Sequence, residues 1–358
     1  MAGNSHTVID DLIIIAGRTA LPADLTAIVA NPNYTAASDT AVLDNPNALI
    51  TDLAIIAGRT VVPSELSAIV ASPNHTVASD SAVASNTHTL ITDLAIIAGR
   101  SAVSPAALSA IVASPNHTAA SDTAVVNNAN TLAADLAIIA GRTVLYMDLS
   151  AIVVHVNQAA ISDSAVVRNP NTLAVDLITI AGRTMLPADL SAIVANPNHT
   201  AASDTAVFEN SNTLIADLAI IAGRTVLSSE LSAIVANPNY SVDSDMAVAG
   251  NPNTLTADLA TVAARLPSTD LSNVASNPNT DQGTLSIVAQ NLFNGLENHV
   301  VPVSELRQYK NSISRFTVAQ QLDLSTYVYD LQEYDVAANM CQEARQNIGK
   351  LMLYSVMH

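Results

Sequence analysis

The chain has 358 residues, of which 49% are hydrophobic but only 3% aromatic, so its core has to be built from aliphatic side chains. Acidic residues outnumber Lys plus Arg by 31 to 13, giving a net charge of −18, which argues against nucleic acid and favours a basic protein partner. The single cysteine, Cys341, excludes an intrachain disulfide.

Targeting signals are not evident in the sequence. The first residues, Met1 to His6, carry no basic segment, so we expect no secretory signal peptide. No uninterrupted apolar run approaches the roughly 18 residues that suggest a membrane span. We therefore expect a cytoplasmic protein without a membrane span, with non-classical export left open.

A Gly-Arg pair that follows an apolar run marks a repeat over residues 1–280. Successive pairs are 41 residues apart, except in the third interval, which has 42. The pairs are Gly17-Arg18, Gly58-Arg59, Gly99-Arg100, Gly141-Arg142, Gly182-Arg183 and Gly223-Arg224, with Ala264-Arg265 as the last copy. Chance does not keep a register over such a distance, so we predict about seven tandem units.

Each unit is predicted to contain three short helices, of which the first spans 213–222 in the sixth copy. Apolar residues there fall at i, i+4 and i+7 from Leu214, which is typical of one helix face. Thr213 suits the N-cap position, and Gly223 suits the position just after the helix. Both ends of this helix are therefore predicted.

The second helix is predicted at about 228–236. In other copies it begins with a proline that suits the first helical position, at Pro63, Pro105, Pro187 and Pro267. An acidic residue follows two positions later in two of these four copies, at Glu65 and Asp189, where the positive end of the helix favours it. Asn237-Pro238-Asn239 then ends the helix.

The third helix, at 241–248, is predicted only weakly, because Ser, Asp and Thr are poor helix formers and its support has to come from neighbouring units. β-Solenoids also repeat, and Ile-Ile pairs favour strands. The sequence shows no alternation of apolar and polar residues, however. Capping residues and spacing agree on helices instead.

Three helices in about 41 residues resemble the armadillo and HEAT class of repeat. The segment from Leu266 to Thr280 is also similar to the variant leucine-rich repeat, although the period differs and no proline follows the Thr. The resemblance covers residues 1–280. It implies an all-α, right-handed α-solenoid.

The register disappears from about residue 281, and both lysines, Lys310 and Lys350, lie beyond that point. A helical apolar face is predicted from Val336 to Leu351. A terminal unit has to cover the last exposed apolar face of a stack, so we predict that residues 281–358 form a helical cap. A partner-docking or oligomerising segment is the alternative.

Two acidic series recur in register with the arginines. Because the units repeat, we expect each recurring polar residue to form one column along the stack. The first lies seven residues before each arginine, at Asp11, Asp52, Asp93, Asp135, Asp176, Asp217 and Asp258. The second lies in the third helix, at Asp39, Asp80, Asp122, Asp163, Asp204 and Asp245. We predict that each second-series Asp forms a bidentate ion pair with the arginine of a neighbouring unit and so fastens the stack.

A third series follows the Asn-Pro-Asn break, at Tyr34, His75, His117, Gln158, His199 and Tyr240. Tyr and Gln replace His in some copies, which neither a metal site nor a general base tolerates. We predict packing at a loop, with contact to a partner as the alternative.

Several of the same loops match the N-glycosylation acceptor pattern, at Asn33-Tyr-Thr35, Asn74-His-Thr76, Asn116-His-Thr118, Asn198-His-Thr200 and Asn239-Tyr-Ser241. A turn asparagine followed by an N-cap hydroxyl explains them better. The sequence contains no phosphate loop, nucleophile elbow, dinucleotide fingerprint or paired cysteines. We therefore expect no catalytic residue, metal or cofactor.

Two functions remain in view. A non-catalytic repeat scaffold that binds a basic protein along its surface is favoured, because solenoids expose long continuous surfaces. A self-assembling filament or lattice subunit is the alternative, because one repeating edge matches the pitch of another.

Overall fold

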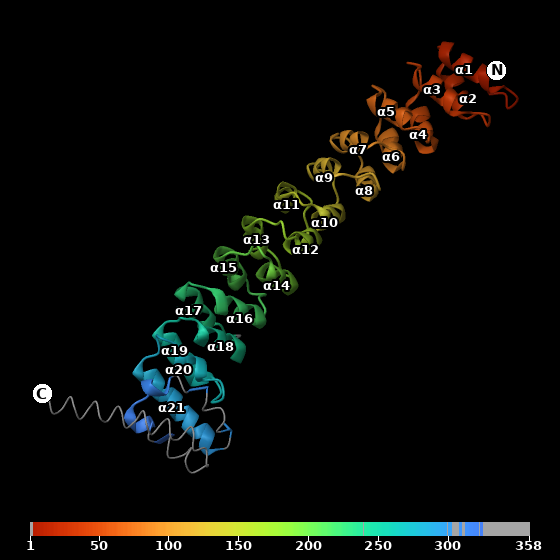
Figure 1. The fold of residues 1–358 in the computed structure, drawn as a ribbon. Helices are drawn as coiled ribbons and strands as arrows, with labels where there is room; N and C mark the ends of the chain where they lie inside the picture. Colours follow the sequence, from red (N-terminus) through yellow and green to blue (C-terminus); the bar gives the residue numbers. More distant parts are fainter. Residues whose placement is uncertain are drawn as a thin grey trace. The chain divides into compact units, whose positions relative to one another are not determined.

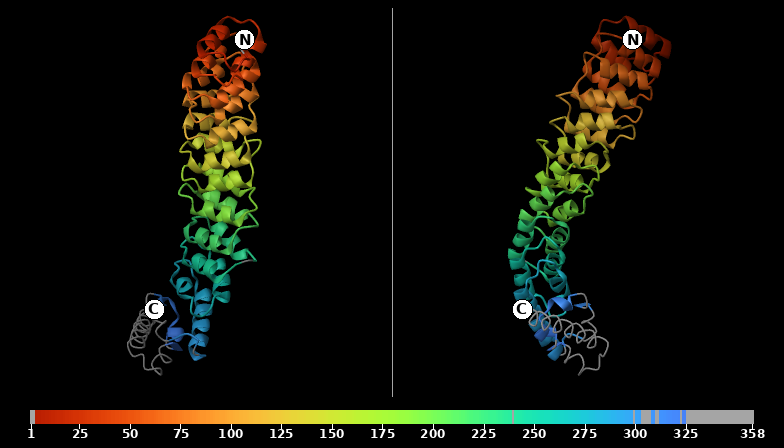
Figure 2. Two further views of the ribbon diagram at one scale, coloured as in Figure 1. Left: turned by 90° about the vertical axis from the view of Figure 1, so that its right-hand side faces the viewer. Right: turned by 60° about the vertical axis from the view of Figure 1, so that its left-hand side comes forward.

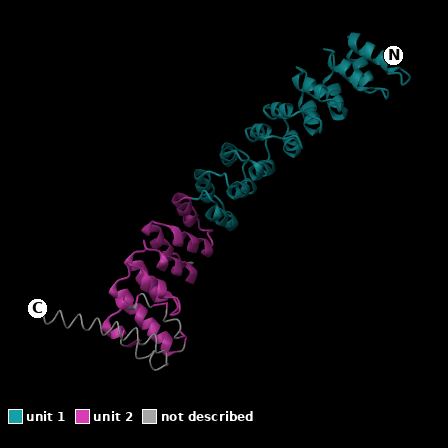
Figure 3. Cartoon of the chain, in the orientation of Figure 1, with its two compact units in different colours: residues 1–199 teal, residues 200–358 magenta. Residues whose placement is uncertain are grey.

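The computed structural model describes residues 3–238, 240–298, 300–302, 308–309, 312–321 and 323–324 (Figure 1). Over these residues the chain is helical and contains no β-strand, which confirms the predicted all-α class. The chain divides into two compact units, residues 1–199 and residues 200–358, which we describe separately (Figure 3).

Unit 1 consists of short helices joined by short loops. They are α1 (Ile9–Arg18), α2 (Pro22–Val29), α3 (Ala36–Leu43), α4 (Ile50–Arg59), α5 (Pro63–Ala71), α6 (Val77–Ser85), α7 (Ile91–Ala98), α8 (Pro105–Ala113), α9 (Ala119–Val126), α10 (Ala133–Arg142), α11 (Tyr146–Val153), α12 (Ala160–Arg168), α13 (Ala174–Ala181) and α14 (Pro187–Ala195). Three sequence types alternate, which we name A, B and C from the order α1, α2, α3.

Unit 2 continues the same order of types, beginning with a C helix. Its elements are α15 (Ala201–Glu209), α16 (Ile215–Arg224), α17 (Ser228–Ala236), α18 (Val242–Gly250), α19 (Thr256–Arg265), α20 (Ser272–Ser276), α21 (Gln282–Glu297) and the 3-10 turn η2 (Ile313–Arg315). The predicted second and third helices of the sixth copy are thus confirmed at α17 and α18.

Local sequence accounts for where the B and C helices begin. Four B helices, α2, α5, α8 and α14, begin with proline, and α17 and α20 begin with serine. The predicted start at Pro267 is wrong, because α20 begins at Ser272. C helices begin with a capping box. In α9 the Thr118 side chain accepts from the Ser121 backbone N–H, and the Ser121 hydroxyl accepts from the Thr118 N–H. This cap stabilises a helix that has little propensity of its own.

The predicted ends of the first helix are wrong at both termini. Helix α16 has Leu214 at its N-cap, without a side-chain cap, while the Thr213 hydroxyl donates to the Val207 carbonyl of the preceding C helix. Gly223 lies inside α16, which continues to Arg224. The Thr213 hydroxyl joins two helices instead of capping α16. At the C-terminus of α16 no residue in the left-handed conformation is needed, because the next residue, Thr225, is extended.

The helices pack in two rows, although their sequence types follow one another in threes. In unit 1 each helix packs mainly against the helices one and two places away in the chain. The odd-numbered helices therefore form one row and the even-numbered helices the other, as Figure 1 shows. In unit 2, α16, α18 and α20 form one row, and α17, α19 and α21 form the other.

Because three helices are wound onto two rows, successive A helices lie in alternate rows. In unit 1, α1, α7 and α13 belong to the odd row, whereas α4 and α10 belong to the even row. A given residue position therefore returns to the same row only in every second copy. This corrects the expectation that each repeated residue forms one continuous column.

The core between the rows is aliphatic, as the composition predicts. Helix α4 buries Leu53, Ile56 and Ala57, and the B helix α5 buries Leu66 and Ile69. Burial of each Leu or Ile side chain contributes about 1.5–3 kcal/mol. Helices of eight to ten residues are marginal alone, so this burial between neighbours supplies most of their stability. Figure 2 gives two further views of the stacking.

The register changes at α21, which has 16 residues. Asp281 caps it by accepting from the Thr284 backbone N–H at 2.7 Å, and this bond lowers the pKa of the Asp281 carboxyl. The described part of segment 281–358 is helical at α21 and η2. The predicted face from Val336 to Leu351, together with Cys341, lies outside the described residues, as do Lys310 and Lys350. No helix among the described residues is long and apolar enough to span a membrane.

Candidate functional site

Each repeat arginine from Arg59 onward forms an ion pair with the second-series Asp that lies 20 residues earlier. In α10, Arg142 Nε donates to Asp122 Oδ2 at 2.9 Å, and its Nη2 donates to Oδ1 at 2.6 Å. Nη1 donates to the Val112 carbonyl at 2.9 Å. One guanidinium therefore joins α10 to both α9 and α8.

The same contact recurs in both units. The pairs are Arg59–Asp39, Arg100–Asp80 and Arg183–Asp163 in unit 1, and Arg224–Asp204 and Arg265–Asp245 in unit 2. The Asp122 side chain is 5% exposed and that of Arg142 26% exposed. Burial raises the pKa of Asp39 although Arg59 opposes the shift. Arg18 is exposed and has no acidic partner among the described residues, since no C helix precedes it there.

The first acidic series bonds to hydroxyl groups instead of arginines. Asp135 of α10 accepts from Ser109 of α8 at 2.6 Å, and Asp52 of α4 accepts from Thr26 of α2 at 3.1 Å. Asp93, Asp176 and Asp258 accept in the same way from Ser67, Ser150 and Ser232. Burial raises the pKa of Asp52 and Asp176. These bonds join each A helix to the B helix next to it in the same row; Asp11 of α1 is exposed.

A further acidic series lies at the third position of the B helices. Asp148 of α11 accepts from Thr143 at 3.0 Å and from Thr123 of α9 at 2.9 Å. Glu65, Asp189 and Glu230 occupy equivalent positions and accept from paired hydroxyl groups as well. The sequence analysis explained these residues by the helix dipole alone. The Thr that regularly follows the repeat arginine was the signal for their hydroxyl partners.

Over residues 45–199 the acidic side chains are consequently buried inside the repeats. Between residues 45 and 199 the sequence contains ten Asp and Glu residues, and all ten are buried. They are Asp52, Glu65, Asp80, Asp93, Asp122, Asp135, Asp148, Asp163, Asp176 and Asp189. The expectation of a basic partner rested on this charge, so over this stretch its physical basis is removed.

Asparagines join the loops in two series. Asn169 Nδ2 donates to the carbonyls of Ala140 at 2.7 Å and Thr143 at 2.9 Å, at the end of the helix two places earlier. Its Oδ1 accepts from the Asn171 backbone N–H at 2.8 Å. Loops after even-numbered helices thus bond to one another, as do loops after odd-numbered helices. An Asn-x-Asn motif after the third helix of most copies, for example at 169–171, was the signal that sequence reasoning missed.

After the second helix of the fourth copy, a histidine stands where the first, fifth and sixth copies have the first asparagine of Asn-Pro-Asn. His155 Nδ1 accepts from the Asn157 backbone N–H at 3.0 Å, and Nε2 lies 3.0 Å from the Asn128 carbonyl oxygen. The pattern assigns the imidazole proton to Nε2, which donates to that carbonyl. The ring therefore reproduces the acceptor and the donor of an asparagine side chain.

The Tyr and His series packs against the Arg–Asp pairs. The Arg59 guanidinium lies 3.5 Å from the centre of the Tyr34 ring, and Arg265 lies 3.8 Å from that of Tyr240. His75 Nδ1 lies 3.5 Å from Asp80 Oδ2. The corresponding distance between His117 and Asp122 is 3.7 Å. Packing at a loop thus accounts for these rings, which stay partly exposed.

This series does not lie on one surface. In unit 1 the residues Tyr34 and His117 follow even-numbered helices, whereas His75 and Gln158 follow odd-numbered ones, so the two pairs belong to different loop series. His199 and Tyr240 follow α14 and α17. A notch of about 520 Å³ lies beside His75, between Val77 and the loop residues Ser101 and Ala102.

The glycosylation-like motifs also have structural roles. Asn33, Asn116 and Asn198 each donate through Nδ2 to two carbonyls of the loop two helices earlier. Thr35, Thr76, Thr118, Thr200 and Ser241 are the N-caps of C helices. Asn239 lies outside the described residues. A turn asparagine and an N-cap hydroxyl therefore account for the pattern where it is described.

In α4, α7, α10 and α16 an Ile-Ile pair places one side chain inside and one outside, whereas α13 and α19 have Thr179 and Thr261 at the outer position. Ile56 of α4 is fully buried, while Ile55 is 48% exposed. Ile14, Ile96 and Ile138 occupy the same outer position and are 51–52% exposed. On α4, Thr51, Ile55 and Gly58 are exposed at i, i+4 and i+7. They form an outer ridge that faces away from the other row.

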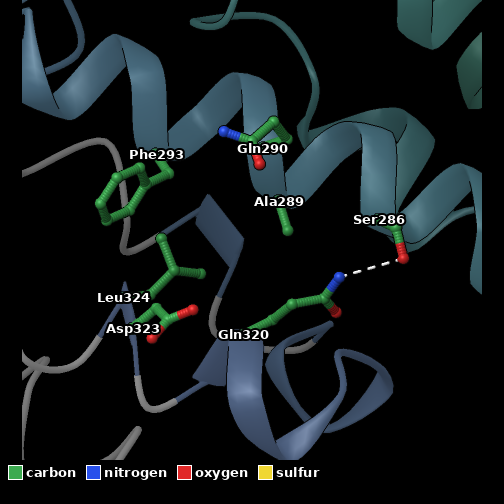
Figure 4. Close-up of a pocket in the computed structure, with 7 residues that line it drawn as sticks. All are labelled: Ser286, Ala289, Gln290, Phe293, Gln320, Asp323 and Leu324. Atoms are coloured by element: carbon green, nitrogen blue, oxygen red, sulfur yellow. Dashed lines mark hydrogen bonds between the residues drawn. The ribbon is translucent and has the colours of Figure 1, made fainter.

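A cavity of about 160 Å³ lies between α21 and the segment that follows η2 (Figure 4). Gln320 Nε2 donates to Ser286 Oγ at 3.0 Å, and Phe293 and Leu324 line the other end. Asp323 is its one ionisable lining residue. The cavity lies where Gln320, Asp323 and Leu324 pack on α21. Its lining residues include no nucleophile–base pair.

Among the described residues, no group of three His, Cys, Asp or Glu side chains is placed to hold a metal ion. No protein-family model, curated protein or solved structure matches the chain. The candidate functional features are therefore the outer ridges and the ring-lined notches of the repeats.

Proposed function

We propose that the chain is a right-handed α-solenoid of about seven three-helix units, of the armadillo and HEAT type, that acts as a non-catalytic scaffold and binds a protein partner along its surface. One observation carries the proposal. Half-exposed isoleucines recur on the outer ridges of the A helices, at Ile14, Ile55, Ile96 and Ile138. Because the units stack in register, these side chains present a regularly spaced apolar series that a protein partner can contact, as solenoid surfaces do.

The chemistry of the polar residues supports a scaffold over an enzyme. A catalytic group has to reach a substrate, whereas the repeated carboxylates are buried and bonded to hydroxyl or guanidinium groups. The asparagines are engaged in joining loops. Each repeated polar position therefore has a structural partner that explains its presence.

The partly exposed side chains of Tyr34, His75, His117, Gln158, His199 and Tyr240 are a second candidate contact for the same partner. The notch beside His75 has room for a partner side chain, and its rim is formed by Val77 and Ala102. Rings that already rest on an Arg–Asp pair are held in place before binding, which lowers the entropy cost of contact.

Capture experiments with the full chain test the proposal. The wild type is compared with a ridge variant, Ile55→Glu with Ile96→Glu and Ile138→Glu, and with a loop variant, Val144→Glu with Met185→Glu. Val144 and Met185 are 72% and 79% exposed, so the loop variant adds negative charge at two exposed loop positions elsewhere on unit 1. We expect the ridge variant alone to lose the captured protein. Absence of any wild-type partner above background, including the chain itself, contradicts the proposal.

Self-assembly into a filament or lattice is the second candidate. It is favoured by the alternation of A helices between two rows, since this places the same ridge on both outer faces of unit 1. A scaffold for a single different protein has no need of two equivalent faces.

A further inference from the structure

The outer ridges of unit 1 lack charge, although the chain as a whole is strongly acidic. Between residues 45 and 199 no carboxylate is exposed, and the exposed charged side chains are arginines at or just beyond helix C-termini, Arg168 and Arg183. The ridge of α4 consists of Thr51, Ile55 and Gly58, and that of α10 of Ala134, Ile138 and Gly141. Neither ridge offers an ion pair to a basic or an acidic partner.

Each ridge has a knob beside a gap. Ile55 and Ile138 project from the ridge, and a glycine follows three positions later in each case. A Cβ atom built on Gly58 or Gly141 would have no neighbour within 4 Å, so open space adjoins each isoleucine. An apolar knob from another helix can pack against this gap, as ridges pack into grooves between helices.

Exposed apolar side chains occur on both faces of unit 1, and on the odd row Ile14 of α1 lies on the same helix as Gly17, which also adjoins open space. Ile55 and Ile138 belong to the even row, through α4 and α10. Ile96 of α7 belongs to the odd row, and so does Val175 of α13, which is 59% exposed at the position one turn earlier. The alternation of A helices between rows is the cause, since a three-helix unit wound onto two rows presents its ridge to each side in turn.

These observations identify a partner. Several exposed isoleucines can pack at once only against a partner whose own gaps have the same spacing. A second copy of the chain meets that condition. Copies with a net charge of −18 repel one another in general, but carboxylates buried inside the repeats add little repulsion across an uncharged ridge. Apolar knobs without charge also suit a contact that persists in salt.

We infer that the two outer ridges of unit 1 are self-docking surfaces, each of which packs against the ridge of a second copy of this chain. The inference rests on the proposed function and names its partner. Because both faces carry a ridge, a dimer formed through one face leaves the other face of each copy open. Assembly is therefore open-ended and does not stop at a closed pair.

Light scattering after size exclusion, over a range of protein and salt concentrations, tests the inference with the full chain. The wild type should form species whose mass rises beyond the dimer with concentration and does not fall with salt. An even-face variant, Ile55→Glu with Ile138→Glu, should stop at the dimer. An odd-face variant, Ile96→Glu with Val175→Glu, should also stop there.

Combining all four substitutions should leave a monomer, with self-association weakened roughly tenfold or more. The loop variant Val144→Glu with Met185→Glu should assemble like the wild type. Circular dichroism should show unchanged helix content in every variant, because the substituted side chains are half exposed or more.

Three results would overturn the inference. They are a wild type that stays monomeric at every concentration, single-face variants that still grow beyond the dimer, and a loop variant that blocks assembly as fully as the ridge variants. Ridge-dependent capture of a different protein by a monomeric wild type would overturn the inference while sparing the proposed function. Ridge-dependent binding of that monomer to phosphatidylcholine vesicles would assign the face to lipid and overturn both.

Discussion

In the repeats of unit 1 and at the end of unit 2, different side chains donate hydrogen bonds to equivalent backbone carbonyls of the loops. In unit 1, Asn196 donates to the carbonyls of Val167 and Asn169, and Asn198 donates to that of Thr172. At the end of unit 2, the single guanidinium of Arg315 donates to the equivalent carbonyls of Ala275, Asn277 and Thr280 at 2.7–2.8 Å. A loop that another repeat would have covered is thus closed by one arginine.

The two regions also differ in the space beside their glycine residues. Glycines of the repeats adjoin open space, whereas a Cβ atom on Gly295 of α21 would lie 2.5 Å from Val301 Cγ2 and 2.6 Å from Ser268 Oγ. The repeats therefore tolerate change on their outside and depend on polar contacts inside. The end of unit 2 depends on close packing against one aperiodic helix.

Breaking an internal ion pair of the repeats should have the largest effect. Arg142→Met leaves the buried Asp122 carboxylate without its cation and the Val112 carbonyl without a donor, which should cost about 3–5 kcal/mol of unfolding free energy. Urea unfolding followed by circular dichroism measures it. Arg168→Met is the matched control, because this side chain is 51% exposed and should cost less than about 1 kcal/mol. Equal costs would show that burial of the pair does not matter.

Removing the loop-joining donors sharpens the comparison between the regions. Asn196→Ala and Arg315→Ala each leave carbonyls without their donor and should each cost about 1–3 kcal/mol. Hydrogen exchange should show faster opening of α12 in the first variant and of α20 and α21 in the second. If Arg315→Ala leaves exchange in α20 unchanged, the arginine does not replace the repeat asparagines.

Paired glycine substitutions test the difference in room. Gly295→Ala forces Val301 or Ser268 to move and should cost about 1–3 kcal/mol. Gly58→Ala lies in α4 beside open space and should stabilise by roughly 0.5–1 kcal/mol, because alanine is the better helix former. Thermal unfolding midpoints that shift in the same direction for both variants would contradict the contrast.

The buried carboxylates set the direction of the pH dependence. Burial raises the folded-state pKa of Asp52 and Asp176 above the ordinary value of 3.8. Their protonated forms therefore favour the folded state, and this contribution is complete below pH 3.8 and is lost as the pH rises through the raised pKa. Urea midpoints should fall over that window in the wild type and fall less in Asp176→Asn. A steeper fall in the variant would reverse the assigned sign.

The smallest effect should come from restoring the repeat asparagine in the fourth copy. His155→Asn keeps an acceptor for the Asn157 N–H and a donor for the Asn128 carbonyl. Unfolding free energy should change by less than about 0.5 kcal/mol. His155→Leu, which removes both bonds at similar size, should cost about 1–3 kcal/mol. Similar values for the two variants would show that the imidazole does not act as an asparagine.

Local features of the repeat were predictable because their causes lie close together in the sequence. A proline such as Pro63 or a threonine such as Thr118 marks where a helix begins, and the constant spacing of Arg142 and Asp122 indicated an ion pair between neighbouring helices. Thr213 was assigned as a cap because a hydroxyl before an apolar run usually has that role. Its actual acceptor, Val207, lies on another helix and could not be inferred locally.

The arrangement of rows depends on packing between helices, so no single unit reveals it. That is why Tyr34 and His75 were expected on one column although they follow helices of different rows. The exposure of Ile55 could have been predicted from the sequence, because a helical wheel places Ile55 opposite Leu53. The hydroxyl partners of Asp135 and Asp148 were not, because they come from helices two places away.

Carboxyl-specific labelling of the folded chain, read by mass spectrometry, tests most directly whether the acidic charge lies inside the repeats. We predict fast labelling of the exposed acids Asp10, Asp11, Asp44 and Asp243. The ten buried acids between residues 45 and 199 should be protected until the chain is unfolded in urea. Labelling of Asp52, Asp93, Asp135 and Asp176 as fast as that of Asp10 would contradict the account, because those carboxylates would then face solvent.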